Sequence, residues 1–279
     1  QAEDGIRDCL LSRGLGDVYK RQVSIATGLM YFMTAMLCPI GAPLMLRIGV
    51  INVVLIVILL EVIGLLCTVL AFEKWHLLVS IGLCLGIASG IIGLGLSATV
   101  ATRWFTARRG LVVGIMTSAF AAGQLIFMPL MAWITTVSNW QFAIAPGLIG
   151  GIICGSLFFL LGKDWPSQLN LAAYGDDKIY YPPKENTGNA ISISFKALSG
   201  AINPPAFWYL TITFFNCGLS STGIIGQHFI PFCADNNVGI IMASSYLALM
   251  GFLNFIGSMG SGWLSDRYKN YTLLAAYYG

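Results

Sequence analysis

Long apolar runs separated by short polar segments make up most of the chain after residue 22. Seven of these runs are residues 23–46, 51–72, 77–101, 111–134, 142–162, 207–232 and 240–264. At 1.5 Å of helical rise per residue, each run is long enough to cross the ~30 Å hydrocarbon core of a bilayer. An eighth run starts at Tyr271 and continues to Gly279. The pattern predicts an all-α protein with seven complete membrane spans and part of an eighth.

The composition agrees with a membrane protein, because charged residues make up only 10% of the chain whereas soluble domains have about 25%. Residues 1–22 differ from the rest, since they are polar and lack the apolar core of a signal peptide. Residues 1–8 and 12–22 each match one reading frame of a common sequencing adapter. We interpret residues 1–22 as a non-native, adapter-derived leader; the alternative is a genuine cytoplasmic tail.

Basic residues indicate which loops face the cytoplasm. Arg103, Arg108 and Arg109 lie between two apolar runs, and an arginine at the bilayer centre costs about 2.5–3.5 kcal/mol. We therefore expect this segment in water or headgroups, and on the cytoplasmic side, because short loops rich in Lys and Arg stay inside. Alternating from there places only Lys74 outside and the following residues inside: Arg47, Arg103, Arg108, Arg109, Lys163, Lys178, Lys184, Lys196, Arg267 and Lys269.

Residues 163–205 interrupt the apolar pattern with five prolines and several charged residues. We predict that they form a cytoplasmic linker between an N-terminal helical bundle, residues 23–162, and the start of a C-terminal bundle, residues 206–279. Within the first bundle, Gly82, Gly86 and Gly90 are four residues apart. This spacing puts small residues on one helix face, where another backbone can approach closely.

Two loops at the inner ends of predicted spans share one pattern. Residues 42–47 and residues 262–267 both read small-x-Leu-x-x-Arg, and they lie on either side of the linker. This suggests an internal repeat of helical halves. The repeated loop resembles the major facilitator superfamily, whose Gly-x-Leu-x-Asp-Arg-x-Gly signature follows its second and eighth helices.

The resemblance implies a fold of twelve helices in two halves. On that template the chain is a fragment that covers helices 2 to 8 and the start of helix 9, and we expect the flanking reading frame to encode the other helices. Residues 103–115, the pair Gly123-Gln124 with Pro129, and residues 166–175 are most similar to bacterial members near the oxalate/formate and monocarboxylate transporters.

The second loop keeps the family's aspartate and arginine as Asp266 and Arg267, whereas the first keeps Arg47 but has Leu46 in place of the aspartate. A carboxylate at a helix end can pair with a neighbouring cation and with the positive N-terminus of another helix. Such contacts can hold one of two conformations. The resemblance therefore implies a conformational switch that includes Asp266, Arg267, Arg47 and Arg108; the alternative is that Asp266 and Arg267 only cap and anchor a helix.

Polar residues inside the runs are candidates for lining a solute path, because polar groups in hydrocarbon are costly unless they face protein or water. The candidate substrate-binding residues are Gln124, Asn216, Ser220 and Asn254. Asn216 and Ser220 share one face at helical spacing. On the family template these runs face the central cavity; the alternative for each residue is an interhelical hydrogen bond.

Two residues could couple transport to protons. Glu61 is the acid farthest inside a span, where burial disfavours the charged carboxylate, and a carboxyl that gains and loses a proton is what coupling needs. The alternative is a neutral, internally hydrogen-bonded Glu61. His228 lies near the predicted outer end of its run, where it could respond to pH or simply pack at the interface.

No cluster with the spacing of a catalytic triad or a metal site is present in the sequence, and neither is a phosphate-binding Gly-x4-Gly-Lys-Ser/Thr loop. The sequence predicts no enzyme, catalytic residue, metal, cofactor or nucleic-acid partner. Our interpretation is a secondary transporter in the bilayer, and we expect its location to be the bacterial inner membrane. It would move a small organic anion such as a monocarboxylate by alternating access, with protons as a possible coupling ion. The alternatives are a seven-helix receptor or sensor and a non-transporting fragment.

Overall fold

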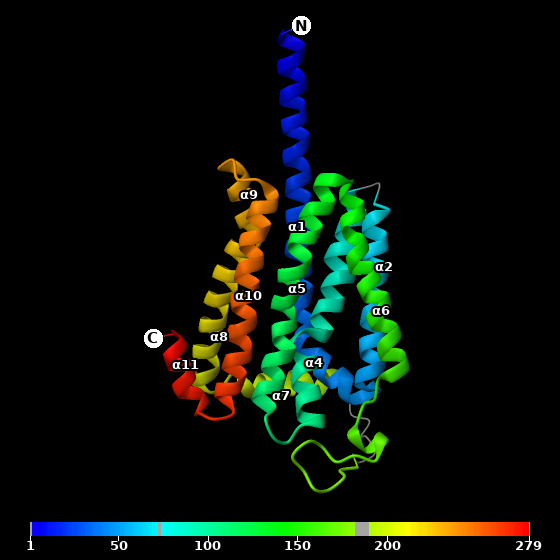
Figure 1. Cartoon of the computed structure of the whole chain (residues 1–279), viewed down its shortest axis with the longest axis vertical. Helices are drawn as coiled ribbons and strands as arrows, with labels where there is room; N and C mark the ends of the chain where they lie inside the picture. The colour runs from blue at the N-terminus through cyan, green and yellow to red at the C-terminus, as the bar shows by residue number, and fades with distance from the viewer. Residues whose placement is uncertain (1, 72–73, 182–189, 279) are drawn as a thin grey trace. The chain divides into compact units, whose positions relative to one another are not determined.

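The computed structural model describes residues 2–71, 74–181 and 190–278, and Figure 1 shows the elements in colour order along the chain. The only β-type pairing in these residues is one isolated bridge between Phe105 and Tyr174. The helical elements are α1 (Ala2–Ile48), α2 (Val50–Val69), α3 (Lys74–Leu77), η1 (Leu78–Leu85), α4 (Gly86–Trp104), α5 (Arg109–Val137), η2 (Trp140–Ile144), α6 (Ala145–Leu161), η3 (Pro166–Leu169), α7 (Ala190–Ala201), α8 (Pro205–Cys217), η4 (Gly218–Ile225), α9 (Gly226–Asp235), α10 (Ile240–Ser265) and α11 (Asn270–Tyr278).

Six helical stretches in the described residues are long and apolar enough to cross a membrane. They are Val23–Ile48, Val50–Val69, Trp75–Trp104, Arg109–Val137, Trp140–Leu161 and Ile240–Ser265. Six of the seven predicted spans are therefore confirmed as apolar helices. The run at 207–232 is helical through α8, η4 and α9 but is not among the six. Its asparagine, serines, threonines, glutamine and histidine make it less apolar than the other runs, and the seventh span stays a prediction.

The first helix extends beyond its predicted span. α1 continues without a break from Ala2 through residues 2–22, which we interpret as an adapter-derived leader. The origin of these residues stays a prediction, because helical geometry does not distinguish native from adapter-derived sequence.

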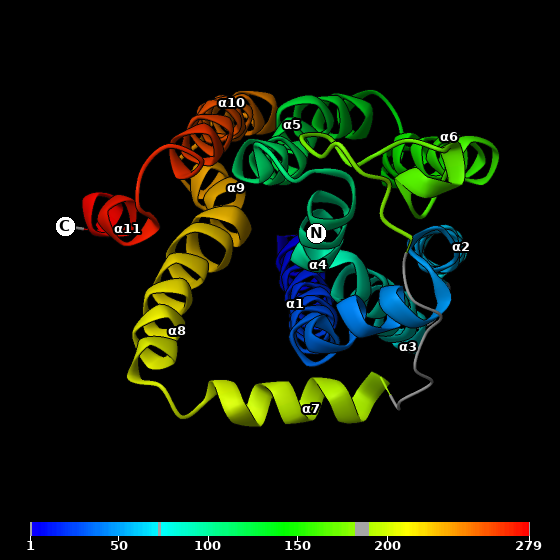
Figure 2. The same ribbon diagram turned by 90° about the horizontal axis from the view of Figure 1, so that it is seen from below.

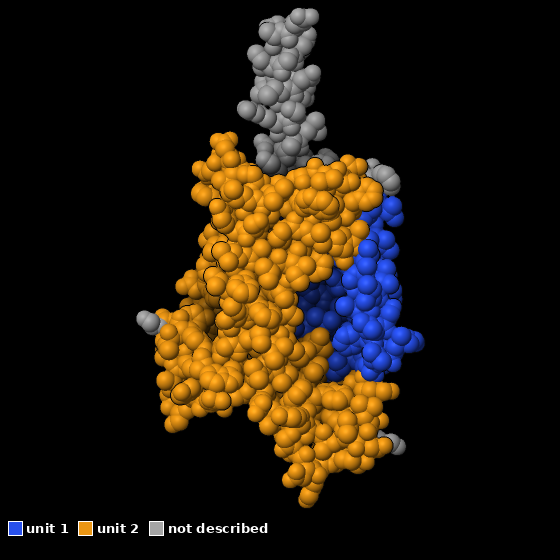
Figure 3. All heavy atoms as spheres, in the orientation of Figure 1, with its two compact units in different colours: residues 1–95, 147–162 blue, residues 96–146, 163–279 orange. Residues whose placement is uncertain are grey.

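The described residues form two compact units, coloured separately in Figure 3. Unit 1 contains residues 1–95 and 147–162, and unit 2 contains residues 96–146 and 163–279. This grouping differs from the two bundles joined by a linker that the repeated loops predict, and those bundles stay a prediction.

In unit 1, glycines let helices pack with their backbones close together. A Cβ at Gly82 would lie 2.7 Å from Leu29 of α1, and one at Gly86 would lie 2.9 Å from the Met30 carbonyl. Gly90 has a similarly close neighbour in α1. The predicted small-residue face of the third span is therefore confirmed, and its partner is α1.

In unit 2, α5 and α10 run side by side (Figures 1 and 2). A Cβ at Gly114 of α5 would lie 2.7 Å from the Ser258 carbonyl of α10, and one at Gly251 would lie 2.9 Å from the Ala121 carbonyl. Ser118 of α5 and Ser244 of α10 are fully buried. Small residues along both helices thus bring the two backbones together, which leaves little room for side chains between them.

The predicted linker contains more structure than its prolines suggest. Besides η3 it includes the helix α7, which Figure 2 shows lengthwise while α5 and α10 are seen nearly end-on. Backbone hydrogen bonds join Tyr174 to the loop after α4: its N–H donates to the Trp104 carbonyl at 2.8 Å, and its carbonyl accepts from Thr106 N at 2.9 Å. The start of the linker is therefore fixed to this loop. Lys184, one of the basic residues predicted to be cytoplasmic, lies outside the described residues.

Candidate functional site

The carboxylate of Asp266 binds the first turn of α5. Its Oδ1 accepts a hydrogen bond from Gly110 N at 2.7 Å, and its Oδ2 accepts one from Leu111 N at 2.8 Å. Asp266 directly follows α10, so the contact joins the end of α10 to the beginning of α5. We call this contact the Asp266 cap. It brings together groups from two helices at the end predicted to be cytoplasmic, which we call the inner end.

Local geometry explains why the first turn of α5 needs this partner. The N–H groups of a helix's first turn have no acceptor within the helix, and the cap residue Arg108 makes no side-chain hydrogen bond to them. Arg108 has a left-handed backbone with φ 59°. Asp266 supplies the missing acceptors, and its negative charge lies at the positive end of the helix dipole. Gly110 allows the approach, because a Cβ there would lie 2.7 Å from Asp266 Oδ1.

The other residues of the predicted switch do not bind the Asp266 carboxylate in the described ion pairs. The Arg267 guanidinium lies 3.9 Å from the centre of the Trp263 ring, in a cation–π contact. The expected pairing of Arg267 with Asp266 is not observed among the described ion pairs. Arg47 lies in the last turn of α1 in unit 1, and Arg108 is exposed at the start of α5 in unit 2. Of the two expected contacts of Asp266, the structure thus shows the one with the N-terminus of another helix, which is α5.

Arg103 differs from its expected environment. We expected it in water or headgroups, but only 7% of the residue is exposed. Its guanidinium lies 3.9 Å from the Asp164 carboxylate and 4.5 Å from the centre of the Trp165 ring. The beginning of the linker therefore covers Arg103 and supplies both a negative charge and an aromatic face, which offset the cost of removing the guanidinium from water.

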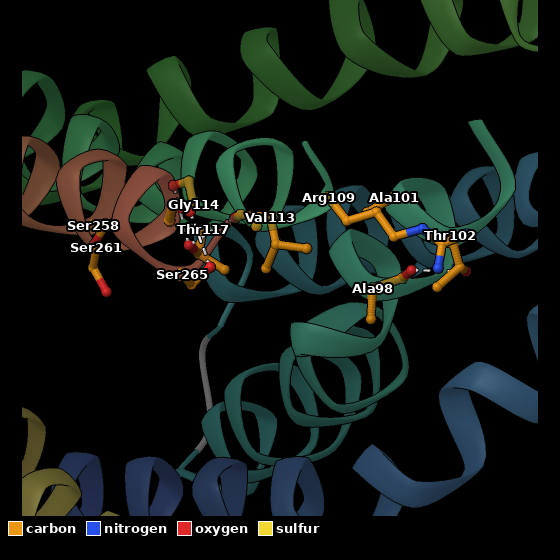
Figure 4. A pocket seen from close by; sticks show the side chains of 12 residues that line it. Ala98, Ala101, Thr102, Arg109, Val113, Gly114, Thr117, Ser258, Ser261 and Ser265 are labelled. Atoms are coloured by element: carbon orange, nitrogen blue, oxygen red, sulfur yellow. Dashed lines mark hydrogen bonds between the residues drawn. The ribbon is translucent and has the colours of Figure 1, made fainter. Parts of the chain in front are cut away.

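A pocket of about 450 Å³ opens beside the Asp266 cap, within unit 2 (Figure 4). It is formed by the ends of α4, α5 and α10. Its lining combines one arginine with hydroxyl and small side chains: Ala98, Ala101, Thr102, Arg109, Gly110, Val113, Gly114, Thr117, Ser258, Ser261, Gly262 and Ser265. The volume is in the range of small-molecule sites.

Most of these lining residues were not among our candidates. The signal that could have identified some of them is the spacing of Ser258, Ser261 and Ser265, which puts three hydroxyls on one face of α10. The contribution of Arg109 has no comparable local signal, because it depends on which helices meet at the inner end.

The structure places Gln124 and Asn254 on the two packed helices. Gln124 in α5 is partly buried, and its Cβ lies 3.3 Å from the position that a Cβ at Gly251 of α10 would occupy. Asn254 is one turn farther along α10, where its Oδ1 accepts a 3.4 Å hydrogen bond from Ser258 Oγ. Since Ser258 also lines the pocket, Asn254 is linked to the pocket wall through this hydrogen bond.

The other two candidate binding residues lie on a separate helical stretch. Asn216 is the second-to-last residue of α8, and Ser220 lies in the π-helical segment η4. The Ser220 hydroxyl donates a 2.9 Å hydrogen bond to the Asn216 carbonyl. Both side chains are exposed. No hydrogen bond joins either of them to Gln124 or Asn254 in the described part of the chain. Short π-helical segments are frequent at functional sites.

The two proton-coupling candidates lie on different helices and are far apart in sequence. Glu61 lies in α2 between the buried residues Val57 and Gly64, but Glu61 itself is exposed. His228 is exposed in α9, seven residues before that helix ends at Asp235. Neither is part of the pocket lining.

Comparison with known proteins identifies related sequences. A family model described as Major Facilitator Superfamily matches residues 11–279. An uncharacterized MFS-type transporter of Bacillus subtilis, YcxA, is 26% identical over 184 residues, which is 63% of this chain and 40% of that protein. Monocarboxylate transporter 12-B of Danio rerio is 24% identical over 84% of this chain and 52% of its own length. Monocarboxylate transporter 13 of Rattus norvegicus is 24% identical over 82% and 48%. The chain thus spans about half the length of these relatives.

Proposed function

Because the chain belongs to the Major Facilitator Superfamily, we propose that it forms part of a secondary transporter that moves a small organic anion, such as a monocarboxylate, by alternating access. The chain is an integral, multi-pass membrane protein with six apolar helices in its described residues. The names of two relatives support monocarboxylates as the substrate class. A relative in Bacillus subtilis supports a bacterial cell membrane as the location. Family membership favours this function over a seven-helix receptor.

The Asp266 cap is the observation that carries the mechanistic part of the proposal. It joins α5 to the end of α10 through two backbone N–H groups and one carboxylate. Alternating access requires contacts that stabilise one conformation and are absent in the other. In our mechanism the cap stabilises the conformation that is closed at the inner end, and it breaks when α5 and α10 separate there.

The solute path in this mechanism follows the polar residues of α5, α8, η4 and α10. Gln124, Asn254, Asn216 and Ser220 would hold the solute through directional hydrogen bonds, while Asp266, Arg267, Arg47 and Arg108 would bias the two conformations. Glu61 or His228 would carry a coupled proton. Amides and hydroxyls both donate and accept hydrogen bonds, which suits the four residues proposed to hold the solute.

An uptake assay tests this proposal with the complete natural reading frame of the chain. Cells that express the protein should take up labelled L-lactate or pyruvate with saturation. Gln124→Leu and Asn216→Leu should each weaken the apparent affinity about 5- to 150-fold, because a solute group that is left without its hydrogen-bonding partner in the bound state costs ~1–3 kcal/mol. Gln141→Leu, outside the proposed path in η2, is the matched control. Unchanged affinity in both variants, with normal membrane expression, would mean that these residues only pack the helices.

A further inference from the structure

The three arginines between α4 and α5 have different environments. Arg103 is buried beside Asp164 and Trp165. Arg108 is exposed and does not line the pocket. Arg109, at the first position of α5, lines the pocket together with residues of α4 and α10, and Figure 4 shows its side chain extended toward Thr102. One of the three arginines therefore lines a cavity.

Arg109 is the one charged side chain among the twelve described residues that line the pocket. A carboxylate that enters therefore meets a single positive charge and no acidic lining residue. The nearby carboxylate of Asp266 is bound to Gly110 N and Leu111 N. This arrangement favours a ligand with one negative charge, because a second negative charge would be left without a partner close to Asp266.

The Arg109 guanidinium is also held in place. Its Nε donates a 2.6 Å hydrogen bond to the Phe105 carbonyl, which leaves the N–H groups of both terminal nitrogens for a ligand. A planar carboxylate matches such a pair of donors in a bidentate arrangement. Because the guanidinium is already oriented, less conformational entropy is lost when a carboxylate binds.

The hydroxyl groups that line the pocket suit the hydroxyl of a small hydroxy acid. Thr102 and Thr117 donate to carbonyls of their own helices, at 2.9 Å to Ala98 and at 2.9 Å to Val113. Their oxygen atoms keep lone pairs that can accept from a ligand hydroxyl. Ser258 donates over a longer distance, 3.4 Å, to Asn254. The pocket thus offers hydrogen-bonding partners on α4, α5 and α10 in addition to the single cation.

We propose that this inner pocket binds the carboxylate of a small monocarboxylate, with Arg109 as the residue that recognises its charge. This inference rests on the proposed function, because the ligand is taken to be the transported solute as it enters or leaves at the inner end. The site differs from the path residues Gln124 and Asn216, and it makes Arg109 a specificity-determining residue. Replacing Arg109 by Gln should weaken binding about 10- to 100-fold, as expected for loss of hydrogen bonds to a charged group.

Site-specific chemical protection tests this assignment on the 279-residue chain in detergent. Phenylglyoxal modifies accessible arginines, and both Arg108 and Arg109 are exposed, so mass spectrometry with fragmentation can follow the two residues in one peptide. L-Lactate should slow modification of Arg109 but not of Arg108. L-Lactamide, which has the same size and no charge, and oxalate, which has two charges, should protect Arg109 much less. Equal protection of both arginines, or no protection of Arg109, would overturn the proposal.

A binding measurement supplies an independent check. Ligand-observed NMR should detect L-lactate on the unmodified chain and on Lys178→Gln, a matched loss of one charge in the exposed linker, but only weakly on Arg109→Gln. Equal signals from Arg109→Gln and Lys178→Gln would also overturn the assignment. The two hypotheses can fail separately. Transport of lactate without protection of Arg109 would contradict the binding site but not the transport function. Protection of Arg109 without transport would contradict the transport function but not the binding site.

Discussion

The Asp266 cap predicts unusual protection of two backbone amides. Gly110 and Leu111 are the second and third residues of α5, so their N–H groups have no acceptor within the helix and would ordinarily exchange rapidly with solvent. Both donate to Asp266, at 2.7 Å and 2.8 Å. Hydrogen exchange at these two amides should therefore be slowed for as long as the cap is formed.

Two substitutions of Asp266 should remove this protection to different extents. Asp266→Asn keeps one acceptor oxygen but loses the charge and the second acceptor. We expect a loss of about 1.5 kcal/mol, or about 10-fold faster exchange, from the lower end of the range for charged hydrogen bonds because Asp266 is exposed. Asp266→Ala removes both acceptors and should approach ~3 kcal/mol, or about 100-fold.

Hydrogen exchange with fragmentation to single residues measures this effect on the chain in detergent or nanodiscs. Val112, whose N–H bonds to the Arg108 carbonyl at 3.2 Å, reports whether α5 itself has frayed. Asp177→Asn, in the exposed linker, is a matched loss of charge and should change neither amide. If Gly110 and Leu111 exchange equally fast with and without the Asp266 carboxylate, the cap does not form in the membrane protein and the proposed inner closure loses its basis.

Three further changes test other parts of the structure. Gly114→Ala should destabilise the α5–α10 pair by about 1–3 kcal/mol and lower the melting temperature, because its Cβ would lie 2.7 Å from a carbonyl of α10; Gly123→Ala in the same helix, with nothing within 4 Å, should have little effect. A cysteine at position 167 should react with an impermeant reagent only from the cytoplasmic side and one at position 139 only from outside, and the reverse labelling would contradict the topology. If Glu61 carries a coupled proton, Glu61→Gln should abolish accumulation driven by a pH gradient but retain exchange, whereas accumulation at the original level would exclude that role.

Local sequence patterns were sufficient for most of the helices. Apolar runs marked six spans because a bilayer selects for length and hydropathy, which are properties of contiguous residues. The spacing of Gly82, Gly86 and Gly90 likewise indicated a face for close packing, although not that α1 would occupy it. The run at 207–232 is helical but less apolar than the six confirmed spans, so its assignment as a span stays a prediction.

The partners of charged residues could not be read from the sequence alone. An acid after a helix suggested a contact with some helix N-terminus, but the choice of α5 depends on a contact between Asp266 and residues more than 150 positions earlier. Burial of Arg103 depends similarly on Asp164 and Trp165 in the linker. The pocket beside Arg109 arises only when three helix ends meet. Tertiary packing, not local propensity, decides each of these features.

Counterflow in proteoliposomes measures the proposed transport activity most directly. Vesicles that contain the protein from its complete natural reading frame are loaded with unlabelled pyruvate and diluted into a trace of labelled L-lactate, with no ATP and no ion gradient. An alternating-access carrier for monocarboxylates predicts a transient accumulation of label inside the vesicles, slower in Asp266→Asn but with an apparent affinity within a few-fold of the unsubstituted protein. Entry of label no faster than into protein-free vesicles, with correctly folded and inserted protein, would contradict the account.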